Sequence, residues 1–297
     1  MTRKTVSILA GAGLLCAACI WGFAFVVVKD SLDYIGPVWM MAFRFSIAAA
    51  GLALLFAPRL KKLNGTYWRD GAVLGAFLFT AYAFQTVGCK YTTAGKNAFL
   101  TTTYVMIVPL IGWLIYHKRP GWYVFVSAVI SVTGIGLLAL KKGDGSLFSM
   151  NFGDILTLVC GLFYALHIIY VEKTNITEDA IVLTVLQFFF AAVFSWITAP
   201  FTDGAFPASQ LANPRVIGSM LYLGLLSTMV AFVLQNVGLK YVQSSLASLF
   251  LSFESVFGVL FSTLVLHEQL TPRMIIGCIL IFFAVVLAET RFDFRKK

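Results

Sequence analysis

The chain has 297 residues, of which 60% are hydrophobic and 12% are charged, and its mean hydropathy is +0.88. Soluble globular chains carry about a quarter charged residues, so this composition excludes a soluble domain as the main body of the protein. The formal net charge of +9 does not indicate nucleic-acid binding, because the basic residues sit at the ends of hydrophobic runs and form no continuous face.

Ten apolar stretches follow one another along the chain, and each has the length of a membrane-spanning helix, roughly 20 residues. They cover residues 6–28, 35–57, 69–89, 95–116, 121–140, 152–171, 179–200, 215–238, 244–266 and 272–289. The connections between them are short and leave no soluble domain. The sequence therefore predicts an all-α polytopic membrane protein that lies in the lipid bilayer.

Lysine and arginine are distributed unevenly between the two sides of this arrangement. With the N-terminus in the cytoplasm, the cytoplasmic segments hold 14 Lys and Arg and the opposite segments hold 7. The connection 59–69 and the tail "RFDFRKK" contribute most to the difference. The positive-inside rule then predicts a multi-pass protein of an inner or plasma membrane with both termini in the cytoplasm.

One phrase occurs twice in the chain. "FQTVGCKYTTAGK" begins at Phe84 and "LQNVGLKYVQSSL" at Leu234, so both copies of Q-x-V-G-x-K-Y are related by an offset of 150. The gap-free register continues to His117 and His267. Apolar sequences resemble each other by chance, but recurring Gln, Lys, Tyr and His residues are a stronger sign of duplication.

The earlier part of each half aligns at an offset of 143, which relates Trp21 to Tyr164 and Arg44 to Gln187. We therefore predict two five-helix repeats, residues 1–145 and 146–297. Because five is odd, the second repeat enters the membrane from the opposite side. Inverted repeats of this kind are typical of secondary transporters, in which they make two oppositely open conformations nearly equal in energy.

Four motifs carry a family resemblance: "IWGFAFVVVK", "FRF", "YTTAGKNAFLTTTYVMIVPLIGWLIYHKRP" and "SLASLFLSFESVFGVLFSTLVLHEQLT". On these motifs the chain resembles the EamA-type branch of the drug/metabolite transporter (DMT) superfamily over essentially its whole length. Glu254 and Glu268 stand at the acidic positions of the last motif, whereas Ser255 replaces the usual proline and His267 the usual glycine. The missing proline removes the usual cause of a helix break in this span. The resemblance implies a transporter of small metabolites, often an exporter of amino acids or related compounds.

Polar residues at membrane depth are informative, because each is costly in hydrocarbon unless it is paired or hydrated. Arg44 lies near the middle of the second stretch and Glu254 near the middle of the ninth. Arg44 is either an anchor for a carboxylate or other anion, or an arginine that braces helix ends or snorkels. Glu254 is either a protonatable group for proton-coupled transport, or a packing acid bonded to a hydroxyl or to Arg44.

Aromatic and amide residues form a second group of candidates. Trp21 and Tyr164 either line a cavity with their ring faces or belong to the interfacial aromatic belts. The amides, Asn236 among them, either bind substrate or hold helices together. Tyr104 and Glu254 are equivalent at the offset of 150, and equivalent positions face each other near the two-fold axis, so they are the preferred pair. The residues predicted to line a substrate cavity are Trp21, Arg44, Tyr82, Gln85, Asn97, Tyr104, Tyr164, Gln187, Gln235 and Glu254.

Other residues are predicted to be structural. Gly71 and Gly75 form a small-xxx-small pattern, which predicts close helix packing. His167, near the cytoplasmic end of the sixth stretch, is interpreted as a packing histidine, with a gate as the alternative.

Competing functions have less support. The histidines are scattered and no H-E-x-x-H motif or phosphate-binding loop occurs, so the sequence predicts no enzyme, no metal site and no cofactor. A channel is disfavoured because no stretch carries a continuous polar stripe. A lipid or lipid-carrier translocase on the same fold stays as the alternative. The expected partner is a small-molecule substrate, with no nucleic acid, and the expected state is a monomer or weak homodimer.

Overall fold

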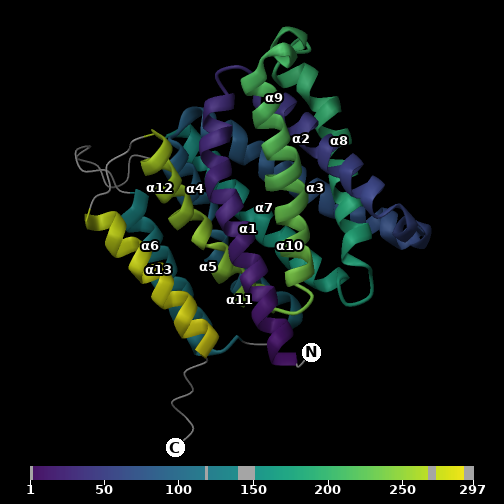
Figure 1. Cartoon of the computed structure of the whole chain (residues 1–297). Helices are drawn as coiled ribbons and strands as arrows, with labels where there is room; N and C mark the ends of the chain where they lie inside the picture. The colour runs from purple at the N-terminus through teal and green to yellow at the C-terminus, as the bar shows by residue number, and fades with distance from the viewer. Residues whose placement is uncertain (1–2, 118–119, 140–150, 267–271, 291–297) are drawn as a thin grey trace, which may run out of the picture.

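The computed structural model describes residues 3–117, 120–139, 151–266 and 272–290, and every regular element in these ranges is a helix (Figure 1). The predicted boundary between the repeats at 145/146 lies outside the described residues, as do His267 and Glu268. In the described part of the chain, seven helices are long and apolar enough to cross a membrane. Three shorter apolar helices complete the set, and the prediction of ten membrane-spanning segments is confirmed.

The helices of the first repeat are α1 (Arg3–Ser31), α2 (Pro37–Leu55), η1 (Ala57–Lys62), α3 (Gly65–Tyr91), α4 (Ala94–Thr101), α5 (Tyr104–Tyr116) and α6 (Trp122–Ala139). Those of the second are α7 (Phe152–Thr174), α8 (Ala180–Thr202), η2 (Ala208–Ala212), α9 (Pro214–Leu221), η3 (Tyr222–Val230), α10 (Ala231–Gly238), α11 (Ser244–Leu251), α12 (Phe253–Leu266) and α13 (Pro272–Thr290).

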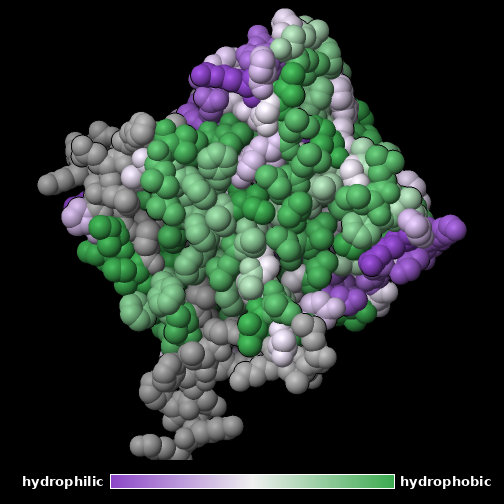
Figure 2. Space-filling view, in the orientation of Figure 1, coloured by the Kyte–Doolittle hydropathy of each residue, from purple (hydrophilic) through white to green (hydrophobic). Residues whose placement is uncertain are grey.

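Helices of the first repeat pack directly against helices of the second. Helix α1 packs against α12 and α10, α3 against α7, α2 against α8, and α6 against α13, which lies beside it at one edge of the bundle (Figure 1). On the face seen in Figure 2, apolar side chains form a broad band between hydrophilic side chains at two opposite edges. This is the surface of a bundle that crosses a bilayer, with its polar residues at the two ends.

The fourth and ninth spans are each interrupted near the middle of the membrane. Helix α4 gives way to α5 at Thr102 and Thr103, and α11 gives way to α12 at Ser252. The ninth span therefore breaks although it lacks the usual proline. Thr103 and Ser252 each donate a hydroxyl hydrogen bond of 2.7 Å to the carbonyl three residues earlier, and Ser255 does the same. These hydroxyls compete with the backbone ladder, so the helix can break without a proline.

The eighth span also departs from a regular helix. Residues Tyr222–Val230 (η3) form a π-helix, in which Thr228 donates its hydroxyl to the carbonyl of Leu223 at 2.6 Å. The equivalent stretch of the first repeat, 72–80, is regular α-helix within α3. Wide turns of this kind are frequent at functional sites, because they turn side chains and carbonyls away from their regular positions.

Two glycines of α3 permit a close approach to α8, as the small-xxx-small pattern predicts. A Cβ atom at Gly71 would lie 2.5 Å from the Cβ of Leu186, and one at Gly75 would lie 2.5 Å from the Cβ of Phe190. The backbones of α3 and α8 can therefore pack at a distance that no larger residue allows.

We expect Gly75→Ala to lower the free energy of unfolding by about 1–3 kcal/mol, because overpacking forces the two helices apart. The added methyl group would also lie 2.9 Å from the carbonyl oxygen of Gln187, which cannot move without shifting α8. Gly112→Ala is the matched control, since a Cβ there meets no atom within 4 Å. Denaturation midpoints of the detergent-solubilised proteins measure the difference, and equal midpoints for both variants would contradict this account of the packing.

Candidate functional site

A cavity lies in the middle of the bundle between the two repeats. Counted with its opening, its empty volume is about 560 Å³. Nine of the ten residues predicted from sequence line it, namely Trp21, Arg44, Tyr82, Gln85, Asn97, Tyr104, Tyr164, Gln235 and Glu254. The cavity therefore combines one guanidinium, one carboxyl group, three amides and several aromatic rings.

Arg44 of α2 is the cationic group of the cavity and is only 2% exposed. Its Nε donates to the Thr228 hydroxyl at 2.8 Å and its Nη2 to the Ser227 hydroxyl at 3.0 Å, both on the π-helix η3. Among the residues that the structure describes, no carboxylate forms an ion pair with Arg44, and Nη1 takes no part in these bonds. A buried guanidinium with a free donor is suited to binding an anionic group.

Tyr82 supports the same guanidinium from one face. The Arg44 Cζ lies 4.5 Å from the centroid of the Tyr82 ring, within the range of a cation–π interaction, and Nη2 lies 3.5 Å from the Tyr82 hydroxyl. The ring is held by edge contacts with Phe45 at 5.2 Å and Tyr164 at 5.6 Å between centroids. The position of the charge is thus fixed by both repeats.

Glu254 is the acidic group of the cavity. The Tyr104 hydroxyl donates to its Oε1 at 3.2 Å, and the two residues are 4% and 3% exposed. The structure brings together the pair that is equivalent under the offset of 150. Each residue lies just after the interruption of its span, Tyr104 at the start of α5 and Glu254 near the start of α12. The broken helices therefore place both side chains in the cavity.

The amides of the first repeat form a connected network on one wall. Gln85 accepts from the Tyr164 hydroxyl at 2.9 Å and donates to the Thr101 hydroxyl at 3.1 Å. Asn97 donates to the backbone carbonyl of Gln85 at 3.0 Å and to the Thr157 hydroxyl at 2.8 Å. The Oδ1 of Asn97 is buried and has no partner among the described residues, so it remains available to a donor.

Aromatic rings close the space around these polar groups. Trp21 donates its indole N–H to the Ser227 carbonyl at 2.7 Å, and its ring meets Phe232 edge-on at a centroid distance of 5.0 Å. Gln235 lies on the same wall as Phe232 and donates to the side chain of Asn236 at 3.3 Å. The cavity can thus enclose an apolar or cationic part of a small molecule beside the anion-binding guanidinium.

Gln187 is the one predicted residue that the structure places elsewhere. It is fully buried in α8, with its Oε1 2.9 Å from Nε2 of His167. Its position matches that of Arg44, but the residues of α3 at the positions of Ser227 and Thr228 are Phe77 and Leu78. Because these side chains are apolar, Gln187 lacks the hydroxyl partners that Arg44 has.

The lining also contains residues that the sequence analysis did not single out, including Phe25, Ile168, Thr101, Ser227 and Phe232. The repeat offsets supply a signal for three of them. Phe232 is equivalent to the predicted Tyr82 at the offset of 150, and Phe25 and Ile168 are equivalent to each other at 143. Ser227 has no such signal, because its place in the cavity depends on the π-helix.

The cavity is built on repeat-equivalent positions. Both members of five pairs line it, at 21/164, 25/168, 82/232, 85/235 and 104/254. The additional lining residues belong mainly to the first repeat, at Ala24, Val28, Thr86 and Asn97. These lie toward the end of the bundle that carries residues 31–37 and 91–94, here called the Lys29 end, where Lys29 donates to the carbonyls of Cys89 and Thr92 at the end of α3. The cavity therefore extends from its centre toward the Lys29 end.

The opposite end, which carries residues 57–62 and 175–179 and is here called the Lys62 end, is closed by polar contacts. Asn175 donates to the backbone carbonyl of Asn236 at 2.7 Å, and the side chain of Asn236 donates to the Thr184 hydroxyl at 2.9 Å. Glu172 accepts from the backbone N–H of Ser244 at 3.3 Å. These bonds tie the ends of α7 and α10 and the start of α11 together.

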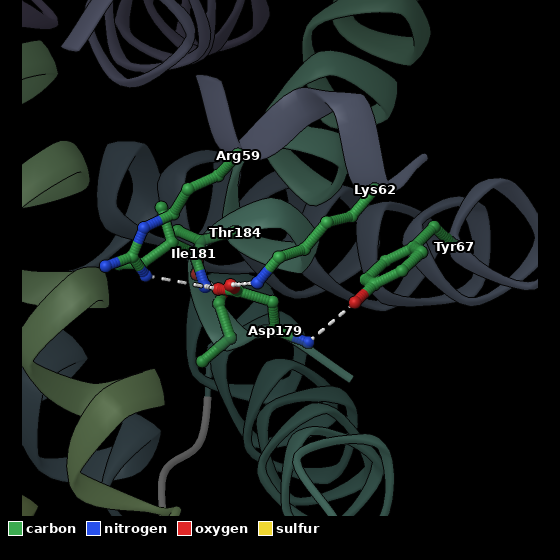
Figure 3. Close-up of polar contacts among 7 residues, drawn as sticks. Arg59, Lys62, Tyr67, Asp179, Ile181 and Thr184 are labelled. Carbon is green, nitrogen blue, oxygen red and sulfur yellow. Dashed lines mark hydrogen bonds and ion pairs between the residues drawn. The ribbon is translucent and has the colours of Figure 1, made fainter. Parts of the chain in front are cut away.

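Asp179 joins three elements at the Lys62 end (Figure 3). Its carboxylate accepts from Lys62 at 2.8 Å and Arg59 at 3.4 Å, and it caps α8 by accepting from the backbone N–H of Ile181 at 3.0 Å. Its own N–H donates to the Tyr67 hydroxyl at 2.8 Å. Partial burial alone would raise the pKa of Asp179, but the hydrogen bond from Lys62, the backbone donor and the two basic charges outweigh it and lower the pKa.

No metal centre accompanies these groups in the described residues, where no three His, Cys, Asp or Glu side chains are placed to hold an ion. The polar groups of the cavity are one cation, one acid and three amides, with aromatic rings around them.

Comparison with known proteins gives a consistent result. A model of the EamA-like transporter family matches residues 8–140 and 151–290, once in each half. An uncharacterized transporter of Archaeoglobus fulgidus is 38% identical over 95% of this chain and 86% of its own length. The uncharacterized transporter YoaV of Bacillus subtilis is 26% identical over 96% of this chain and 98% of its own. One crystal structure, 15% identical, covers 100% of this chain and 99% of its own with a TM-score of 0.79, a likeness of fold.

We expect Asp179→Ala to lower the free energy of unfolding by about 1–2 kcal/mol, because it removes a helix cap together with a partly exposed ion pair. Asp179→Asn keeps the cap and should cost less, about 0–1 kcal/mol. Denaturation in detergent measures both, with Lys61→Ala as the control at a neighbouring exposed lysine.

The stabilisation by Asp179 should decrease as the pH falls, and the same denaturation experiment can measure this. Because the folded-state pKa of Asp179 is lowered, its stabilising effect is complete above its ordinary pKa of about 4 and is lost as the pH falls through the folded value. The difference between wild type and Asp179→Asn should therefore shrink below about pH 4. A difference that stayed constant down to pH 3 would show that the ion pair contributes nothing.

Proposed function

Because the chain belongs to the EamA-like transporter family, we propose that this multi-pass membrane transporter carries small organic metabolites as a secondary transporter, with amino acids or related compounds as its leading substrates. The substrate binds in the central cavity, which opens alternately to the two ends of the bundle. Export is the favoured direction. Both termini lie in the cytoplasm, in agreement with the uneven distribution of Lys and Arg.

One observation carries this proposal: a cavity between two inverted repeats holds a guanidinium from one repeat and a carboxyl group from the other. Arg44 and Glu254 both line it, and neither is paired with the other. A substrate site at the repeat interface near the membrane midplane is the arrangement found in transporters built from inverted repeats. Charged side chains at membrane depth mark substrate or ion pathways.

Each polar group has a role in this proposal. The free donor of Arg44 binds a carboxylate or another anionic group of the substrate, while Gln85, Asn97 and Gln235 hydrogen-bond its remaining polar atoms. The rings of Trp21, Tyr82, Tyr104 and Tyr164 line the space around it. Glu254 is the candidate for proton coupling, since its carboxyl group can gain or lose a proton as the site changes its exposure.

We expect Arg44→Gln to weaken binding of an anionic substrate by about ten- to a hundredfold, because a hydrogen bond to a charged group contributes about 1.5–3 kcal/mol. Arg59→Gln is the matched control, since Arg59 lies at the surface, where its side chain contacts Asp179 and Phe56 outside the cavity. Substrate affinity is measured by calorimetry or by half-saturation of uptake. Equal affinity for Arg44→Gln and wild type would assign Arg44 a purely structural role.

The function itself is tested by uptake of a panel of labelled amino acids into proteoliposomes, with and without a pH gradient. We expect saturable uptake of at least one compound, driven by the gradient in wild type and uncoupled from it in Glu254→Gln. Gradient-independent exchange that is unchanged in Glu254→Gln would remove proton coupling and make this glutamate structural. Absence of any amino acid flux, in protein with an unchanged denaturation midpoint, would overturn this substrate class and favour lipid-like substrates.

A further inference from the structure

The repeat-equivalent positions do not all line the cavity, and the exceptions follow a pattern. Four residues of the first repeat extend the lining toward the Lys29 end, namely Ala24, Val28, Thr86 and Asn97. Their equivalents in the second repeat are His167, Val171, Asn236 and Ala247, and none of these lines the cavity. Likewise, Arg44 lines the cavity and its equivalent, Gln187, does not. At each of these positions the first repeat lines the cavity and the second does not.

His167 and Gln187 are buried behind the cavity wall without satisfying their hydrogen-bonding capacity. Both are 0% exposed, and they bond each other through one atom each, at 2.9 Å. The remaining atoms, Nδ1 of His167 and Nε2 of Gln187, have no partner among the described residues. Leaving buried polar atoms without partners costs free energy, so this pair is better satisfied in a conformation that exposes it to water or ligand.

The ring of Phe232 lies at the cavity and also contacts His167. Phe232 lines the cavity on one side, and on the other its centroid lies 5.9 Å from the His167 ring. Along the chain, His167 directly precedes Ile168, which lines the cavity. Phe232 follows two residues after the π-helix η3, the irregular segment of the bundle. A rotation at this point would move the ring and would join the buried pair to the cavity.

We propose that His167, Gln187 and Asn236 line the substrate cavity when it opens toward the Lys62 end. The proposal rests on alternating access, in which the two inverted repeats exchange conformations. After that exchange, positions 167, 187 and 236 take the places that Ala24, Arg44 and Thr86 have in the present structure. The bonds from Asn175 to Asn236 and from Asn236 to Thr184, which close the Lys62 end, break in the same step.

This assignment gives the two openings different chemistry. Toward the Lys29 end the substrate meets the Arg44 guanidinium, whereas toward the Lys62 end it meets an amide and an imidazole. By the same exchange Arg44 withdraws behind the wall, as Gln187 does now. An anionic group therefore meets a charged donor only when the cavity opens to the Lys29 end, so the two openings differ in their affinity for it.

Site-specific labelling tests the inference without knowledge of the substrate. Single cysteines are placed in a parent in which all five native cysteines are replaced, and sealed vesicles are treated from either side with a membrane-impermeant trimethylammonium methanethiosulfonate. Lys61→Cys, exposed in η1, identifies the Lys62 side. We expect Gln187→Cys to react at least tenfold faster from the Lys62 side than from the other, and Thr86→Cys to show the opposite preference.

Ala191→Cys is the matched control, since Ala191 is equally buried one turn further along α8 and packs against Gly75. The inference would be overturned if Gln187→Cys reacted no faster than Ala191→Cys. It would also be overturned if Gln187→Cys reacted only from the side that labels Thr86→Cys. His167→Cys repeats the measurement from a different helix, so the result does not depend on the folding of one variant. Uptake by the cysteine-free parent in the same vesicles tests transport separately, because the labelling pattern needs no substrate.

Discussion

The Arg44 guanidinium lies in the middle of the bundle with 2% of its surface exposed, and the rest of the site is arranged around it. Removing such a charge from water costs several kcal/mol unless hydrogen bonds replace the lost solvent. The acceptors come from the other repeat, where the π-helix η3 turns the hydroxyls of Ser227 and Thr228 toward it. The requirement for these acceptors links α2 to η3, and the Tyr82 ring completes the enclosure. Because no carboxylate of the described residues neutralises the charge, a polar space stays open beside it.

The inverted duplication supplies a nearly symmetric frame for an asymmetric set of side chains. Tyr104 and Glu254 occupy equivalent positions and bond each other across the two-fold axis, yet one is a phenol and the other an acid. Arg44 is likewise equivalent to Gln187, a neutral amide. The frame allows the two halves to exchange conformations, while the side chains determine how differently a substrate is held at each end.

The contacts at the two ends of the bundle belong to two classes. Asp203 accepts from the backbone N–H groups of Val38 and Trp39 at the start of α2, and Asp179 performs the equivalent function at the start of α8. These clamps are present at the open and the closed end alike, which indicates that they hold α2 and α8 as a fixed scaffold. The bonds of Asn236 have no counterpart at Thr86 among the described residues, so they are the contacts that differ between the two ends.

The sequence by itself determined the ten spans, the duplication and nine of the residues that line the cavity. Apolar length decides which segments cross a membrane, and this property is local to each segment. The offset of 150 then related Tyr104 to Glu254, and symmetry required them to meet. Only the tertiary structure decided toward which end the cavity extends, why Gln187 lies behind the wall with His167, and where the fourth and ninth spans break. These features depend on hydroxyls that compete with backbone bonds and on partners some 20 to 180 residues away in the chain, such as His167 for Gln187 and Ser227 for Arg44. Local sequence patterns carry no record of such long-range contacts.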